Sequence, residues 1–166
     1  HPYIPYMPYG SNDVDGIVNA NVLSTLSLLN EINSDEVTAA VKFIEKKCEK
    51  GKYDRVGTYY PNRYHFPYAV SKAYNNGVNQ LYTSTNHLVE YLISHQNKDG
   101  SWSSKRKVNK KDILQSTVYA LNALIYIGNF EQNSTNMAIE SAFSYIQNSS
   151  ITDEFGVHWK GGVFFS

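Results

Sequence analysis

One segment, from Tyr91 to Trp102, constrains the fold of this chain more than any other. It runs as an aromatic residue, an aliphatic residue, three residues, Gln96, three residues, Gly100, one residue and Trp102. A glutamine at the end of a helix can donate to unpaired backbone carbonyls at a neighbouring helix terminus. Glycine permits the tight turn that follows, and the indole can pack over that turn. The segment therefore predicts a structural tie between one helical hairpin and the next, made by Gln96, Gly100 and Trp102.

The same order recurs in weaker form on both sides of this segment. The pair Tyr91-Leu92 has counterparts in Phe43-Ile44 and Tyr145-Ile146. The position of Gln96 is taken by Cys48 and Ser150, and the glycine-to-tryptophan end by Gly51-Lys52-Tyr53 and by Gly156-Val157-His158, with Trp159 next. Residues 13–30 also align without gaps with residues 112–129. A repeat of about 50 residues indicates a stacked helical array, in which each unit buries its apolar face on the next.

Apolar residues spaced at the helical period, with capping residues and glycine stops, predict six helices. They cover residues 13–30, 34–50, 67–75, 84–96, 111–127 and 134–148. Short and long connectors alternate, which groups the helices into three hairpins in series. We therefore expect an all-α fold, a partial toroid of about three helical hairpins, as one domain over residues 1–166. Residues 1–12, rich in Pro and Tyr, are predicted to form an extended arm.

The Gln96-to-Trp102 segment and its two degenerate copies resemble the QW repeat of squalene-hopene cyclases and oxidosqualene cyclases. These families belong with the protein prenyltransferases to the α/α-toroid superfamily. The resemblance implies inner and outer helices that alternate in a barrel of up to six pairs. Three pairs then look like half a toroid, so the implied partner is the remaining half or another subunit. Because the chain begins at His1 and not at Met, we expect it to be part of a larger protein.

The same resemblance implies a terpenoid-cyclase-like domain that binds an isoprenoid or similar apolar ligand. If it is an enzyme, the expected class is a class II terpene cyclase-like isomerase or lyase, in which an Asp-x-Asp-Asp motif protonates the substrate. The nearest string here is Asp13-Val14-Asp15-Gly16. Asp15 falls on the position of the proton donor, Asp13 on that of its assistant, and Gly16 replaces the last Asp. The alternative is that both carboxylates cap and charge the first helical turn.

Two further groups of residues are candidates for ligand binding. Aromatic rings can stabilise a carbocation, and five of them crowd one connector: Tyr59, Tyr60, Tyr64, Phe66 and Tyr68. His65, in the same connector, is a further candidate ligand-binding residue. Lys105, Arg106 and Lys107 begin a basic loop that can clamp a diphosphate or another anion. Ordinary hairpin packing explains the rings equally well, and a solvated loop explains the basic residues.

Composition excludes several other classes. The formal net charge is zero, which favours no nucleic-acid partner. No apolar run reaches the length of a membrane span, so a soluble and cytoplasmic protein is favoured, although the sequence does not fix the compartment. The single cysteine, Cys48, excludes an intrachain disulfide and a four-cysteine zinc site.

Two alternatives to a cyclase stay open. The first is a non-catalytic helical-repeat module that binds a partner or ligand. The second is metal-dependent chemistry: we expect no cofactor, but the openings of the inner helices would gather Asp13, Asp15, His65 and Asp112 at one rim, with His158 on the last connector. Carboxylate and imidazole groups at such a rim would suit a divalent metal.

Overall fold

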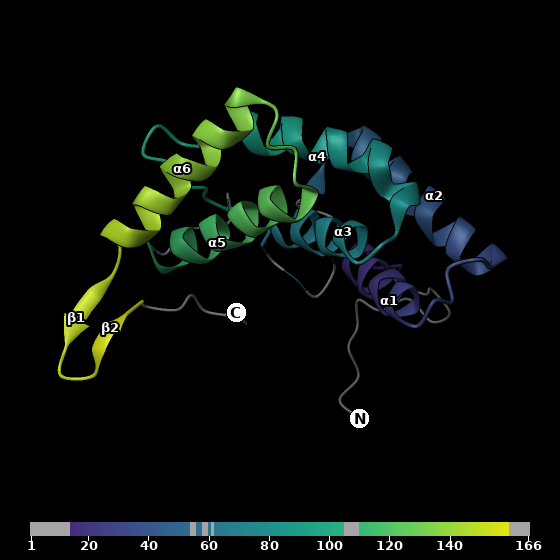
Figure 1. The fold of residues 1–166 in the computed structure, drawn as a ribbon, viewed down its shortest axis with the longest axis horizontal. Helices are drawn as coiled ribbons and strands as arrows, with labels where there is room; N and C mark the ends of the chain where they lie inside the picture. The colour runs from purple at the N-terminus through teal and green to yellow at the C-terminus, as the bar shows by residue number, and fades with distance from the viewer. Residues whose placement is uncertain (1–13, 54–55, 58–59, 61, 105–109, 160–166) are drawn as a thin grey trace, which may run out of the picture.

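The computed structural model describes residues 14–53, 56–57, 60, 62–104 and 110–159. In these ranges the chain forms six α-helices, a short 3-10 helix and one small antiparallel strand pair (Figure 1). The elements are α1 (Gly16–Leu28), α2 (Asp35–Lys50), α3 (His65–Asn75), η2 (Asn79–Leu81), α4 (Tyr82–Ser94), α5 (Lys110–Ile127), α6 (Asn133–Asn148), β1 (Ile151–Asp153) and β2 (Gly156–His158). The predicted all-α fold of three helical hairpins is confirmed, while the predicted arm over residues 1–12 lies outside the described residues.

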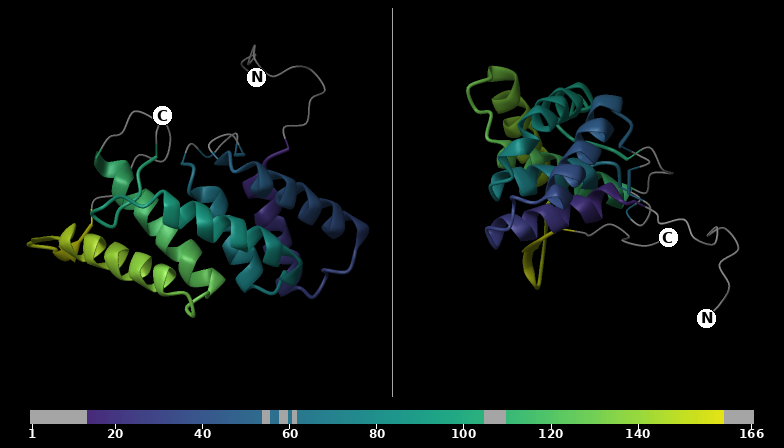
Figure 2. Two further views of the ribbon diagram at one scale, coloured as in Figure 1. Left: turned by 90° about the horizontal axis from the view of Figure 1, so that it is seen from above. Right: turned by 90° about the vertical axis from the view of Figure 1, so that its right-hand side faces the viewer.

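The helices form two layers of a curved array. α3 packs between α1 and α5 in the inner layer, and α4 packs between α2 and α6 in the outer layer. Each inner helix also contacts the outer helix that follows it in sequence. Figure 1 shows the result as an arch, with α2, α4 and α6 on its convex side and α1, α3 and α5 on its concave side. The views in Figure 2 show the same two layers. This arrangement is that of a partial α/α toroid.

Local signals in the sequence set the helix ends. The Ser34 side chain accepts a hydrogen bond from the backbone N–H of Val37 at the start of α2. Gly51 ends the same helix in the left-handed conformation, with a φ of 60°. α1 begins at Gly16, three residues after the predicted start, because Asp15 is its extended N-cap residue.

The core lies between the two layers and falls into two clusters. The first joins α1, α2, α3, η2 and the start of α4, and includes Leu23, Ile44, Phe66, Val70 and Leu88. The second joins α4, α5 and α6, and includes Leu92, Trp102, Leu121, Leu124 and Ala142. Tyr91 and Ile127 pack against both clusters. Each hairpin therefore buries its apolar face on the next, as the repeat predicts.

The strand pair was not predicted. Ile151 pairs with His158 and Asp153 with Gly156, and the Phe155 N–H donates to the Asp153 carboxylate in the turn. Gly156 has a φ of 92°, which suits the turn. None of the helices in the described ranges is long and apolar enough to cross a membrane.

Candidate functional site

The segment from Gln96 to Trp102 forms a clasp between hairpins. Gln96 Nε2 donates to the carbonyl oxygen of Gly100 at 3.0 Å and to that of Ala138 on α6 at 2.8 Å. Trp102 is fully buried, and its indole N–H donates to the Leu92 carbonyl at 2.8 Å. The Trp102 backbone N–H donates to the Thr117 hydroxyl on α5 at 3.0 Å. The clasp thus holds both helices of the following hairpin to the end of α4.

Gly100 is required by the geometry of this clasp. Its φ of 86° lies in the left-handed region, where the backbone of residues other than glycine is strained. A Cβ atom at this position would also collide with the backbone carbonyl of Ser141 on α6. The turn therefore lies directly on α6, and the predicted structural role of Gly100 has two separate causes.

The third copy repeats part of the clasp with a different turn. The Trp159 indole N–H donates to the Ile146 carbonyl at 2.8 Å, as Trp102 does to Leu92. Leu92 and Ile146 are equivalent in the repeat. Trp159 is therefore the counterpart of Trp102, and the strand pair β1–β2 replaces the tight turn at Gly100.

Asp15 is placed at the N-terminus of α1 as its cap. Its Oδ1 accepts hydrogen bonds from the backbone N–H groups of Ile17 at 2.8 Å and Val18 at 3.0 Å. The side chain is buried, and its charge also acts on His65 at the start of α3. The capping alternative is thus a role that the structure shows, and the role as an acid stays a prediction. Asp13 lies outside the described residues.

The replacement of the last motif aspartate by Gly16 has a packing reason. Gly16 is buried, and its N–H donates to the Val56 carbonyl at 2.9 Å. A Cβ atom on Gly16 would overlap the side chains of Val56 and Phe66. The start of α1 approaches its neighbours so closely that an aspartate at this position would force the side chains of Val56 and Phe66 to shift.

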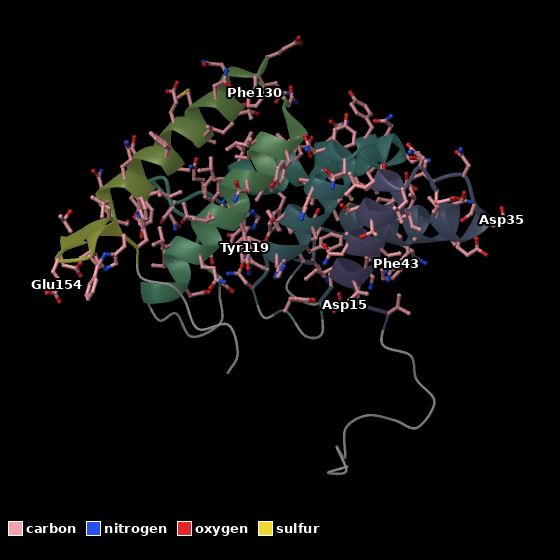
Figure 3. All side chains as sticks on the ribbon, turned by 60° about the horizontal axis from the view of Figure 1, so that its bottom comes forward. Asp15, Asp35, Phe43, Tyr119, Phe130 and Glu154 are labelled. Atoms are coloured by element: carbon pink, nitrogen blue, oxygen red, sulfur yellow. The ribbon has the colours of Figure 1, made fainter. Side chains whose placement is uncertain are left out.

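A group of five rings, which we call the aromatic cluster, forms on the inner helices. It consists of Tyr60 before α3, His65 and Tyr68 on α3, and Tyr119 and Tyr126 on α5. The His65 ring stacks on Tyr119 with centroids 4.7 Å apart and meets the edge of Tyr60 at 4.5 Å. All five side chains are half-buried, so each keeps some accessible surface. In Figure 3, with the underside of the arch turned forward, Tyr119 is labelled on α5 and Asp15 at the start of α1.

A polar group lies beside the aromatic cluster. Asn62 Nδ2 donates to the Asp112 carboxylate at 3.2 Å and to the Ser116 hydroxyl at 2.8 Å, both on α5. Its Oδ1 accepts from the Tyr64 N–H at 3.0 Å. Burial raises the pKa of Asp112, and the hydrogen bond from Asn62 opposes that rise. Asn62 thereby fixes the connector before α3 against the first turns of α5.

Burial also sets the protonation of the rings. It lowers the pKa of His65, and the nearby Asp15 charge opposes this only in part. Burial raises the pKa of Tyr68 and of Tyr119. Burial therefore favours the uncharged forms of His65, Tyr68 and Tyr119, and the hydroxyl groups of the two tyrosines are able to donate hydrogen bonds.

The predicted ligand-binding residues fall into three groups. Tyr60, His65 and Tyr68 belong to the aromatic cluster. Tyr64 and Phe66 are fully buried and pack in the core, where Phe66 contacts Tyr53 at 5.4 Å and Tyr64 contacts Tyr91 at 6.3 Å between ring centroids. Tyr59, Lys105, Arg106 and Lys107 lie outside the described residues.

Tyr119 and Tyr126 of the aromatic cluster were not predicted. They lie on α5, where ordinary helix packing explains a tyrosine, and only the tertiary contact of α3 with α5 brings them to His65 and Tyr68. The helical spacing of Tyr119 and Tyr126, seven residues apart, was the signal that places both on one side of α5. Arg63, in the connector before α3, is buried, and its Nε has no hydrogen-bond partner within the described part of the chain.

The predicted metal rim is gathered only in part. Asp15 lies near His65, and Asp112 is linked to the same connector through Asn62. His158 instead lies in the strand pair, 3.5 Å from the Asp153 carboxylate. Among the described residues, which do not include Asp13, no three His, Cys, Asp or Glu side chains are grouped so that they could hold a metal ion.

Comparisons with protein-family models, with curated proteins and with solved structures found no match to this chain. The class of protein is therefore defined by its fold: an all-α chain of helical hairpins in two curved layers, with an aromatic cluster on the inner helices.

Proposed function

We propose that this chain is a terpenoid-cyclase-like module that binds an isoprenoid or a similar apolar ligand against the aromatic cluster. The observation that carries the proposal is the convergence of five half-buried rings from three segments on the inner helices. The neighbouring rings Tyr64 and Phe66, by contrast, are fully buried in the core. The cluster instead keeps accessible ring surface, which is suited to contact with branched apolar chains.

The polar groups beside the cluster favour a ligand with an apolar body and one polar end. Asn62 and Asp112 lie at one side of the rings and can contact a hydroxyl or another donor group. Burial lowers the pKa of His65 and so favours its neutral form, which is suited to contact with an apolar chain and not with an anion. The apolar chain is therefore expected to contribute most of the binding free energy.

Binding can be tested by calorimetry with geranylgeranyl diphosphate as the probe and inorganic diphosphate as its head-group control. We expect Tyr119→Ala to weaken binding of the isoprenoid about tenfold, because loss of one contacting ring costs about 1.4 kcal/mol. The matched control is Tyr82→Ala, which removes an exposed tyrosine of α4 outside the cluster. Equal affinity of the two variants, or equal binding of diphosphate alone, would contradict the proposal.

A catalytic role for Asp15 is a further step that needs its own test. Asp15→Asn is well suited because asparagine caps a helix about as well as aspartate but cannot deliver the acidic proton. Incubation of the protein with squalene and with geranylgeranyl diphosphate should give cyclic products that the variant does not form. Equal product yield from Asp15→Asn would remove Asp15 from the mechanism. Binding without any product would instead favour the non-catalytic helical-repeat module.

A further inference from the structure

The end of the array formed by α5 and α6 repeats two internal interfaces, but none of the described helices covers it. Equivalent positions follow from the repeat, which superposes Phe43-Ile44, Tyr91-Leu92 and Tyr145-Ile146. By the same alignment Val41, Val89 and Phe143 are equivalent. Val41 is 6% exposed and Val89 4% exposed, whereas Phe143 is 56% exposed.

The clasp aromatics show the same difference. Tyr53 is 3% exposed, Trp102 is fully buried, and Trp159 is 47% exposed. In the first two copies the following hairpin covers these side chains: Val41 and Tyr53 share a cluster with residues of α3 and α4, and Val89 and Trp102 share one with residues of α5 and α6. Within the described residues no helix follows α6 to do the same for the third copy. We call the surface of Phe143, Val157 and Trp159 the tail face.

The opposite end of the chain has the features that such a surface requires. α1 and α2 lie where α5 and α6 lie in their own hairpin, and residues 13–30 align with 112–129. Val18 and Val22 on α1 and Val14 just before it are 45%, 50% and 58% exposed, on the side that α2 and α3 leave uncovered. On α2, Ala39 is exposed and Ala40 half-buried, at the positions of Ser141 and Ala142. Ser141 is the residue on which the Gly100 turn rests. We call this surface of α1 and α2 the head face.

We infer that the tail face binds the head face of a second copy of this chain. The contact would continue the internal interfaces. The segment around Trp159, the third copy of the clasp, would contact α1 and α2 of the next copy as the clasp at Trp102 contacts α5 and α6. Such a contact is heterologous, because different surfaces meet, and repeats until the assembly closes. The arch bends in one direction (Figure 1), so copies joined in this way curve towards a ring.

The inference predicts a defined mass in solution. Light scattering after size exclusion should give a whole multiple of the 18.8 kDa chain mass, two or more, with a monomer appearing on dilution. Phe143→Glu places a charge in the tail face, and Val22→Glu places one in the head face. Each variant alone should therefore be monomeric. Both side chains are exposed, so circular dichroism should show unchanged helix content. Met137→Glu is the matched control, because Met137 is 60% exposed on the same helix as Phe143 but roughly a third of a turn away from it.

Mixing the two monomeric variants separates this inference from other modes of association. Phe143→Glu keeps an intact head face and Val22→Glu an intact tail face, so an equimolar mixture should form a heterodimer through one sound contact. A wild-type chain that stays monomeric up to submillimolar concentration would overturn the inference. So would a mixture that stays monomeric although the wild type associates, because that result indicates contact between like faces. Loss of association in Met137→Glu would also count against it.

Discussion

Gln96 at the end of α4 donates a 2.8 Å hydrogen bond to the carbonyl of Ala138 in α6, a residue 42 positions further along the chain. The same amide nitrogen donates to Gly100, so one side chain joins the turn and the next hairpin. A backbone carbonyl within a helix already accepts one bond from the helix itself. The glutamine therefore uses the second lone pair of the Ala138 oxygen, and no other helical bond has to break.

Removing this amide should destabilise the fold without unfolding it. We expect Gln96→Ala to lower the free energy of unfolding by about 1–2 kcal/mol, because two partly buried hydrogen bonds are lost. Urea titration followed by circular dichroism measures the change. Gln147→Ala is the control, since Gln147 is exposed on α6 and its substitution should cost less than about 0.5 kcal/mol. Equal losses in the two variants would show that the clasp contributes nothing beyond helix propensity.

Two glycines allow the collision at Gly100 to be separated from its backbone conformation. Gly100 and Gly51 both have left-handed φ values, 86° and 60°. A Cβ atom at Gly51 meets nothing within 4 Å, whereas one at Gly100 collides with the Ser141 carbonyl. We expect Gly51→Ala to cost about 1 kcal/mol and Gly100→Ala at least about 2 kcal/mol more. Thermal unfolding of both variants tests this, and similar costs would mean that α6 can move away from the turn.

Cys48 should make stability depend on pH in the alkaline range. Burial raises its pKa from the ordinary value of 9.0 to about 12, and the Tyr53 hydroxyl, which donates to the Cys48 carbonyl, is also buried with a raised pKa. The unfolded chain loses these protons first, so stability is fully present below about pH 9 and is lost as the pH rises from there. Urea unfolding at pH 7 and at pH 10.5 should show the loss.

The contribution of the thiol can be isolated by substitution. Cys48→Ala should reduce the loss of stability between these two pH values, whatever its effect on stability at pH 7. The thiol of the folded wild type should also resist a thiol reagent at pH 8, since it is buried and protonated, and react once urea unfolds the chain. Rapid reaction of the folded protein would contradict this account of Cys48.

His65 should act in the opposite direction, at acidic pH. Burial lowers its pKa below the ordinary value of 6.5, so the unfolded chain binds the proton first as the pH falls. The stabilising contribution of the neutral ring is therefore present above about pH 6.5 and is lost as the pH falls through the pKa of the folded state. His65→Phe keeps a flat ring against Tyr119 and removes the proton. We expect this variant to lose less stability between pH 7 and pH 5 than the wild type, as measured by thermal unfolding.

The sequence predicts the parts of this fold that depend on neighbours along the chain. The helix from residues 34 to 50 was recognised because its apolar positions and its Ser34 cap are local signals, and the helix from 134 to 148 was recognised by its apolar positions. The clasp was recognised because Gln96, Gly100 and Trp102 lie within seven consecutive residues. The capping role of Asp15 was also open to prediction, since an aspartate before a helical run is a common N-cap.

The site itself depends on contacts between distant segments. His65 and Tyr119 stack although 54 positions separate them, and no periodic pattern predicts which ring of α5 faces which ring of α3. Tyr64 and His65 are adjacent in the sequence, yet one is core and the other belongs to the aromatic cluster, because α3 turns by about 100° per residue. The strand pair β1–β2 was missed because its short strands occupy the place where the repeat predicts a tight turn.

The clasp at Gln96 and Trp102 reaches only forward along the chain, to α5 and α6. Removal of the α5–α6 hairpin would expose the Trp102 indole and leave the Gln96 amide without its acceptor on Ala138. Removal of the α1–α2 hairpin would leave these contacts intact. The two losses therefore differ in kind. The first breaks hydrogen bonds of the clasp, whereas the second spares the clasp but exposes apolar side chains of α3 such as Phe66 and Val70.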